Sequence, residues 1–193
     1  MKFHLVLSRH TQTHWNAQYR YSGQADVSLD DTGILQAHDL GERLSSHLLS
    51  FIYSSDLIRT ATTSRAIAEK QKPQIQVRTD VRLREVHVGE MTGLTKSDAD
   101  LRFPAPHFST HHPEFDFRST GGESALQVRS RLHDFLYDLA SSHSDFVTTG
   151  PHILLMGHGS AFRHFLTHHG HIWNLPQGGF QIVTLDLPPR KEL

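Results

Sequence analysis

Short apolar runs of strand length alternate along this chain with segments whose apolar residues recur at helical spacing. The clearest runs are residues 3–7 and 153–156. The second has no polar residue, which is typical of a central strand that is buried on both faces. This alternation predicts an α/β protein, specifically a three-layer α/β/α sandwich with a mostly parallel central sheet.

The expected elements follow the chain in a regular order. Strands are expected at residues 2–8, 51–54, 74–77, 153–156 and 180–187. Helices are expected after residues 30–33, from 57–60 until the Lys-Pro pair at 72–73, from 123–124 to about 142, and after residue 159. The first helix is expected to pack through residues at helical spacing, namely Ile34, Ala37, Leu40, Leu44 and Leu48.

The helical and strand patterns become weaker between residues 89 and 122. This segment holds two prolines and scattered aromatic residues, and only a short helix at about 96–101 is expected in it. We interpret residues 89–122 as a small cap inserted over the ligand edge of the sheet. A length of 193 residues suits one domain, so the cap belongs to a single domain 1–193. The charged tail after the prolines at 188 and 189 is expected to be mobile.

Composition excludes several functional classes. The chain has no cysteine, which rules out disulfides, thiolate metal sites and cysteine nucleophiles. Its net charge of −1 and its lack of a basic stripe argue against a nucleic-acid partner. The N-terminal apolar run is too short for a signal peptide, and no run reaches membrane-spanning length. We therefore expect a cytoplasmic protein with no membrane partner.

Basic residues lie at three predicted strand ends. Arg9 and His10 end the first strand, and His158 lies between two glycines where the central strand meets a helix. Arg59 lies in the first turn of its helix, where a cation opposes the helix dipole unless an anion binds nearby. The carboxyl ends of parallel strands meet at one sheet edge, where α/β proteins bind their ligands. The sequence therefore predicts a phosphate site there. The alternatives are a solvated surface arginine at position 59 and, at position 158, a histidine that caps a strand end.

Six blocks of the sequence carry a family resemblance. Residues 9–16 (Arg-His-Thr-Gln-Thr-His-Trp-Asn) resemble the Arg-His-Gly-x-Thr-x-x-Asn signature of the histidine phosphatase superfamily, also called phosphoglycerate mutase-like. The other blocks are similar to later segments of that family in the same order, and they lie at residues 23–37, 54–61, 83–89, 121–124 and 156–159. The resemblance extends along the chain to at least Arg163.

The resemblance implies a role for each matching residue. His10 would be the nucleophile and Glu85 the proton donor. The phosphoryl oxygens would be held by Arg9, Asn16, Arg59, a protonated His158 and Gly159. Glu85 would need a raised pKa, which burial under the cap is expected to supply. A surface ion pair with Arg82 or Arg84 is the alternative role for Glu85.

Three departures from the family pattern stand out. Thr11 replaces the glycine after the nucleophile, where it narrows the approach of the backbone to phosphate and adds a hydroxyl. Ser22 stands where many family phosphatases have glutamine, and Gln24 is a possible substitute. Residues 91–92 replace the tryptophan and acid that are common after the glycine at 89. The last departure bears on substrate preference more than on chemistry.

Other candidate residues are expected to be structural. The 17 histidines include His164, His168, His169 and His171, whose spacing allows a zinc site, but no carboxylate ligand is evident, so we interpret them as surface residues. The cap aromatics and Arg118 are interpreted as packing residues in preference to ligands. No cofactor and no metal are expected.

These observations predict a metal-independent phosphomonoester hydrolase of the histidine acid phosphatase type, acting through a phosphohistidine on a small phosphorylated metabolite. A cofactor-independent or bisphosphate-primed mutase of the same family is an alternative, although a mutase usually has a longer enclosing insertion. A phosphate-binding module without catalysis is the other alternative. The sequence leaves the substrate and the oligomeric state open.

Overall fold

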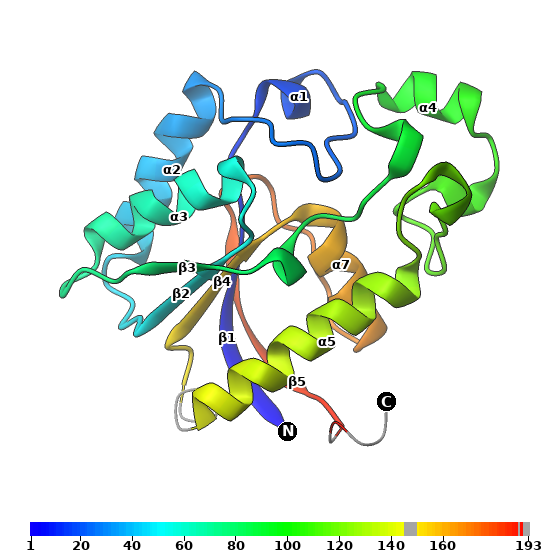
Figure 1. The fold of residues 1–193 in the computed structure, drawn as a ribbon. Coiled ribbons are helices and arrows are strands. Elements are labelled where there is room, and N and C mark those ends of the chain that lie inside the picture. The colour runs from blue at the N-terminus through cyan, green and yellow to red at the C-terminus, as the bar shows by residue number, and fades with distance from the viewer. Residues whose placement is uncertain (145–149, 189, 191–193) are drawn as a thin grey trace.

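A five-stranded sheet forms the centre of the computed structural model, which describes residues 1–144, 150–188 and 190 (Figure 1). The strand order is β3-β2-β4-β1-β5. β5 is antiparallel to β1, and the other neighbouring strands are parallel. The strands are β1 (Lys2–Arg9), β2 (Phe51–Ser54), β3 (Val77–Thr79), β4 (Ile153–Gly157) and β5 (Phe180–Asp186).

Helices cover both faces of this sheet, so the predicted three-layer architecture is confirmed. α2 (Asp31–Leu44) and α3 (Ile58–Lys70) pack on one face, and α5 (Ala125–Ser142) and α7 (Gly159–His168) lie on the other (Figure 1). Alternate residues of β1 serve the two layers, because successive side chains of a strand point to opposite faces. Val6 packs in the core with α2 and α3, whereas Leu5 and Leu7 pack in the core with α5 and α7.

The register of the parallel strands aligns their carboxyl ends. Arg9 of β1 pairs with Gly157 of β4, and Ser54 of β2 pairs with Met156. His10 therefore follows its strand at the same edge as His158, and α3 begins just beyond β2. Both helices that start at this edge, α3 and α7, present their N-terminal turns to it, as the sequence predicts for a ligand site.

Two predicted details of the first helix and the third strand are wrong. Ile34 and Leu48 are exposed, because α2 ends at Leu44 and packs through Ala37, Leu40 and the small Gly41 against α3. The third strand starts at Val77, later than the expected residue 74. Its register is set by β2, where Ile52 pairs with Val77, and the four residues of β2 leave room for only a short partner strand.

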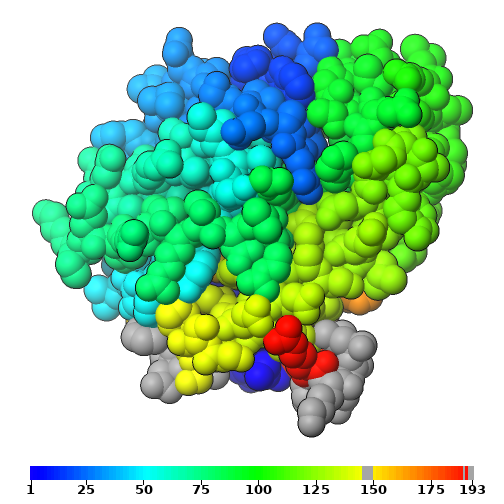
Figure 2. Space-filling view, in the orientation of Figure 1, coloured from blue at the N-terminus to red at the C-terminus, as the bar shows by residue number. Residues whose placement is uncertain are grey.

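Residues 89–122 form the predicted helix α4 (Lys96–Arg102) and three short turns of 3-10 helix. These turns are η2 (Gly89–Met91), which precedes α4, and η3 (Pro106–Phe108) and η4 (Arg118–Thr120), which follow it. The segment lies beside residues 14–25, which begin with the short helix α1 (His14–Ala17), at the top of the molecule (Figure 2). Backbone hydrogen bonds of 2.8–2.9 Å join Tyr21 to Gly93 and Leu94.

The cap aromatics pack against one another, as expected. Phe115 and Phe117 are buried with ring centroids 5.4 Å apart, and Phe108 stacks on Phe117. Arg118 is exposed and pairs with Asp116 outside the cleft. Most of the predicted C-terminal tail lies outside the described residues. No helix in the described part of the chain is long and apolar enough to cross a membrane.

Candidate active site

A cleft of about 410 Å³ lies at the carboxyl ends of β1 and β4. It is lined by six of the seven predicted site residues, namely Arg9, His10, Asn16, Arg59, Glu85 and Gly159. The seventh, His158, is fully buried behind them, and its ring centroid lies 5.2 Å from that of His10. The structure therefore brings together residues that are up to 150 positions apart in the sequence.

The His10 imidazole is held in one tautomer. Its Nδ1 lies 2.7 Å from the carbonyl oxygen of Thr11. Because a carbonyl oxygen only accepts hydrogen bonds, Nδ1 carries the proton and Nε2 keeps a lone pair. Burial, followed by the charges of Arg59 and Arg9, holds the pKa of His10 well below its ordinary value. His10 is therefore neutral and presents a nucleophilic nitrogen.

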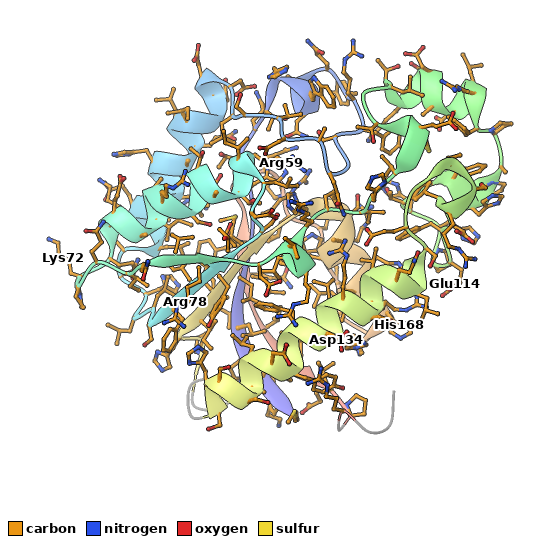
Figure 3. The ribbon with its side chains drawn as sticks, viewed as in Figure 1. Arg59, Lys72, Arg78, Glu114, Asp134 and His168 are labelled. Atoms are coloured by element: carbon orange, nitrogen blue, oxygen red, sulfur yellow. The ribbon has the colours of Figure 1, made fainter. Side chains whose placement is uncertain are left out.

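Arg59 is buried beneath the cleft with its guanidinium fixed by backbone carbonyls. Nη1 donates to Ala25 and Nη2 to Gly23, over 2.7 and 2.8 Å. Its pKa is lowered to about 10, first by burial and against the opposite effect of Glu85 and Asp26. Figure 3 shows Arg59 near the start of α3, whereas Lys72 lies at the far outer edge of the molecule. The cation predicted from its unfavourable position on the helix thus lies at the site.

Arg9 lies against the first turn of α7. A Cβ at position 159 would lie 3.0 Å from the Arg9 Cζ, so a larger residue there would displace the guanidinium by a few tenths of an ångström. The Arg9 Nη1 donates to the Leu175 carbonyl over 2.9 Å. Within the described residues, the buried Nε atoms of both Arg9 and Arg59 have no hydrogen-bond partner. Two guanidiniums therefore retain unsatisfied donors, which is costly unless a ligand accepts from them.

The surroundings of His158 favour a neutral imidazole, whereas a protonated one was expected. Burial, Arg59 and His10 are the largest causes that hold its pKa well below the ordinary value. Among the described residues, neither ring nitrogen has a hydrogen-bond partner. An imidazole in these surroundings is neutral, and a bound phosphate dianion would favour its protonated form by opposite charge.

Glu85 binds the N-terminus of α7. Its Oε1 accepts from the backbone N–H groups of Val86 and Ala161 over 2.9 and 2.7 Å, and its Oε2 accepts from Ser160 over 3.1 Å. These three donors, rather than apolar burial, define its environment, which differs from the expectation. The N-terminus of α7, which lies at the sheet edge where the phosphate site is predicted, thus receives this carboxylate.

Glu85 also lacks the alternative ion pairs that the sequence suggested. Arg82 pairs with Asp80 and Asp138, and Arg84 pairs with Asp56. Both guanidiniums are thereby directed away from the Glu85 carboxylate. Glu85 is consequently left to face the cleft.

Asn16 is oriented by a capping box at the start of α1. Its Oδ1 accepts from the backbone N–H of Thr13, while its own backbone N–H donates to the Thr13 hydroxyl. The side-chain oxygen is therefore used, and the amide Nδ2 remains as a donor at the cleft wall.

Thr11, the unexpected residue of the first motif, is fully buried and does not line the cleft. Its backbone N–H donates to the Thr63 hydroxyl, and the two hydroxyl oxygens lie 3.1 Å apart. The Thr63 hydroxyl donates to the Arg59 carbonyl over 2.7 Å. The threonine thus links the peptide that orients His10 to the helix that carries Arg59.

The second departure from the family pattern is Ser22, for which Gln24 was a possible substitute. The buried Ser22 hydroxyl has no hydrogen-bond partner within the described residues, and Ser22 lines the cleft. Gln24 does not line it and instead donates to the Glu85 carbonyl over 3.1 Å. Gln24 therefore does not replace the missing glutamine.

Sequence reasoning missed several cleft residues. Arg20, Lys96 and Arg163 line the cleft, together with Tyr21 and His111. Arg163 lies four residues beyond Gly159 on α7, and that helical spacing was the available signal. Lys96 and His111 come from the cap, whose weak patterning offered none.

The histidines considered for zinc have other partners. His164 Nε2 lies 3.0 Å from the Arg129 guanidinium, and His169 Nε2 lies 2.9 Å from His133 Nε2. Two of them are not surface residues as expected, because His164 is buried and His169 is partly buried. In the part of the chain that the structure describes, no three histidine, aspartate or glutamate side chains are grouped to hold a metal ion.

Known proteins resemble this chain over most of its length. Phosphoglycerate mutase-like protein 4 of Arabidopsis thaliana is 36% identical over 82% of this chain and 67% of its own length. Glucosyl-3-phosphoglycerate phosphatase of Mycolicibacterium vanbaalenii is 32% identical over 80% of this chain and 68% of its own.

A solved structure of the mycobacterial glucosyl-3-phosphoglycerate phosphatase with VO3 superposes with a TM-score of 0.75 at 31% identity, covering 84% of this chain and 79% of that one. Residues 5–187 match the sequence pattern of the histidine phosphatase superfamily, branch 1. The relatives include both phosphatases and mutases. The chain belongs to the histidine phosphatase superfamily (branch 1).

Proposed function

We propose that the chain hydrolyses small phosphomonoesters through a phosphohistidine formed on His10. The observation that carries this proposal is the His10 ring itself. Its Nδ1 is engaged by the Thr11 carbonyl, and its nucleophilic Nε2 lies in a cleft lined by Arg9 and Arg59. A neutral nitrogen nucleophile beside two cations suits attack on a phosphate dianion.

The proposed reaction has two chemical steps, in which Glu85 first gives a proton and then recovers one. In the first, Nε2 of His10 bonds to phosphorus, the ester P–O bond breaks, and the leaving oxygen takes a proton from Glu85. In the second, the Glu85 carboxylate takes a proton from water, the hydroxide bonds to phosphorus, and the P–N bond breaks. Arg9, Arg59 and His158 stabilise the charge on the phosphoryl oxygens throughout.

Glu85 must carry a proton at the start of this cycle. Its Oε1 already accepts two backbone N–H groups, whereas Oε2 accepts only that of Ser160. Oε2 therefore has the free lone pair on which the proton can lie. We infer that Oε2 faces the leaving group.

The cleft carries more positive charge than one phosphoryl group requires. The arginines and lysine in its lining are Arg9, Arg20, Arg59, Lys96 and Arg163. Within the described residues none of them pairs with a carboxylate, although most other arginines do. Since Arg9 and Arg59 suffice for the phosphoryl group, we propose that the other three favour substrates with a second acidic group.

Arg163 is the residue on which this preference is expected to depend most. Its Nη2 makes only long contacts of 3.3–3.4 Å, to Thr110 and Ser160, so it is available to a ligand. Wild-type enzyme should prefer O-phosphoserine to O-phosphoethanolamine, which lacks the carboxylate. Arg163→Met should reduce that preference in kcat/KM by roughly tenfold or more, the effect of one charge-assisted hydrogen bond.

A matched control for Arg163 lies in the cap. Arg102 is exposed and pairs with Glu90 outside the cleft, so Arg102→Met should leave the ratio of the two kcat/KM values unchanged. An unchanged ratio in Arg163→Met would refute the proposed second-anion preference while leaving the hydrolytic mechanism intact.

Hydrolysis and mutase activity are separated by one assay. The cap is only 34 residues long by its expected bounds 89–122 and contributes few groups to the cleft, which suits transfer to water. Incubation with 3-phosphoglycerate and a bisphosphate primer should release inorganic phosphate faster than it forms the 2-phospho isomer. Faster isomerisation would favour the mutase alternative, and phosphate binding without either reaction would favour a binding module.

We further propose that residues 1–193 act as one domain with 89–122 as its cap, because Lys96, Thr110 and His111 of this segment line the cleft. The proposed chemistry needs no metal, since the protein's own cations supply the positive charge. A histidine acid phosphatase subtype and a cytoplasmic location remain part of the proposal.

A further inference from the structure

Arg131 of α5 contacts the backbone around Glu85 at several points, and the Gln24 amide also donates to the Glu85 carbonyl over 3.1 Å. Arg131 Nη1 donates to the carbonyl oxygens of Arg82 and Arg84 over 2.6 and 2.7 Å, and its Nη2 donates to that of Glu85 over 3.1 Å. Apart from the short η1 turn (Val81–Leu83), the segment that carries Glu85 has no helix or strand of its own. Three contacts from one rigid planar guanidinium therefore hold a segment that has little regular secondary structure.

Glu123 fixes this guanidinium in place. Its Oε1 accepts from Arg131 Nε over 2.9 Å, and its Oε2 accepts from Arg131 Nη2 over 3.1 Å. The same Oε2 accepts from the His87 backbone N–H, and the Glu123 backbone N–H donates to the His87 carbonyl. The pair is mostly buried, with side-chain exposures of 15% for Arg131 and 19% for Glu123.

Gly122 explains why the 121–124 block takes this form. A Cβ at position 122 would lie 2.4 Å from the His87 carbonyl oxygen and 2.8 Å from the Gly89 backbone nitrogen. Only glycine permits this approach of the two backbones. The family block that had no role in the proposed chemistry therefore brings Glu123 against the residues that follow Glu85.

We propose that Arg131 is a positioning residue for Glu85, acting with Glu123 as its anchor. The inference rests on the proposed acid role of Glu85. α7 holds the carboxylate through Ser160 and Ala161, while Arg131 holds the main chain on the opposite side. Loss of the guanidinium removes three of the contacts to this main chain and leaves the Gln24 amide on the Glu85 carbonyl, so the segment shifts and the Oε2 proton is displaced from the leaving oxygen.

This role has a signature that a purely structural role lacks. Protonation of the leaving group matters most for alkyl phosphates, whose alkoxide is a poor leaving group, and least for p-nitrophenyl phosphate. A misplaced acid therefore lowers kcat/KM selectively for alkyl esters. A general loss of structure lowers kcat/KM for the alkyl ester and for p-nitrophenyl phosphate by the same factor.

The experiment compares kcat/KM for p-nitrophenyl phosphate and for an alkyl phosphate in five proteins. Glu85→Gln should lose on the order of a hundredfold or more on the alkyl ester and much less on the aryl ester. Arg131→Met and Arg131→Lys should show the same selectivity, with roughly tenfold losses on the alkyl ester. The matched control on the same helix is Arg129→Met, because Arg129 pairs with Glu114 and contacts no part of the Glu85 segment. Arg129→Met should have the same ratio of the two kcat/KM values as the wild type.

The lysine variant separates geometry from charge. The positive charge of Arg131 also helps to lower the pKa of His158. Lysine keeps that charge but loses the fork that reaches three carbonyls, so wild-type behaviour in Arg131→Lys would overturn the proposal. Equal losses on both esters would also overturn it. If Arg131→Met fails to fold, the lysine variant alone decides.

The Glu85→Gln variant distinguishes the two levels of the argument. Selective loss in Glu85→Gln without selective loss in the Arg131 variants refutes positioning and leaves the proposed function standing. Absence of selectivity in Glu85→Gln itself refutes the acid role, and the positioning role fails with it.

Discussion

Replacement of His10 by alanine is expected to lower phosphate release from p-nitrophenyl phosphate by about a thousandfold or more, because the covalent route then has no nucleophile. The neighbouring His158 cannot take its place, because it is fully buried and does not line the cleft. The measurement is the steady-state rate of phosphate release at saturating substrate.

The control for this variant is His14→Ala, because His14 is an exposed histidine four residues along the same segment. Its activity should match the wild type. Binding of inorganic phosphate to His10→Ala, measured by calorimetry, should persist because Arg9 and Arg59 are intact. A His10→Ala enzyme with undiminished turnover would contradict the mechanism.

Replacement of Arg59 by alanine is expected to lower kcat/KM by about 10²–10³-fold, the typical effect of removing one group that stabilises developing negative charge. The buried guanidinium has a free Nε and is fixed by the Gly23 and Ala25 carbonyls. Lysine cannot satisfy both carbonyls and a phosphoryl oxygen at once, so Arg59→Lys should recover only part of the rate.

The matched control for Arg59 is Arg65→Ala, because Arg65 lies on the same helix with its side chain exposed. Thermal unfolding of both variants separates loss of stability from loss of activity. A folded Arg59→Ala protein with wild-type kcat/KM and wild-type affinity for inorganic phosphate would exclude Arg59 from the site.

The order of strands and helices was predictable because each element carries its own periodicity. The apolar run of β4 and the capping residues Asp30 and Ser124 are local signals, and the structure places each where it was expected. The predictions that were wrong concern positions whose structure depends on contacts with other elements. Leu48 fits the helical spacing, but α2 ends before it, and β3 takes its register from β2.

The candidate site was predictable where it follows strand ends. Arg9, His10 and His158 adjoin β1 and β4, and Arg59 begins the helix after β2. Other features required the tertiary structure. The three N–H donors of Glu85, the Thr11–Thr63 link and the Arg131 contacts all join segments that no local pattern relates. The motif that contains Glu85 therefore could not show that its carboxylate is held by backbone N–H groups of α7, where burial under the cap was expected.

The most direct test of the account is detection of the phosphoenzyme. Wild-type protein is mixed rapidly with a phosphomonoester, denatured in alkali, which preserves phosphohistidine, and digested for mass spectrometry. The account predicts one acid-labile phosphoryl group on His10 that forms and decays fast enough to explain the rate of phosphate release. Turnover that proceeds without phosphorylation of His10, or with the phosphoryl group on another residue, would contradict it.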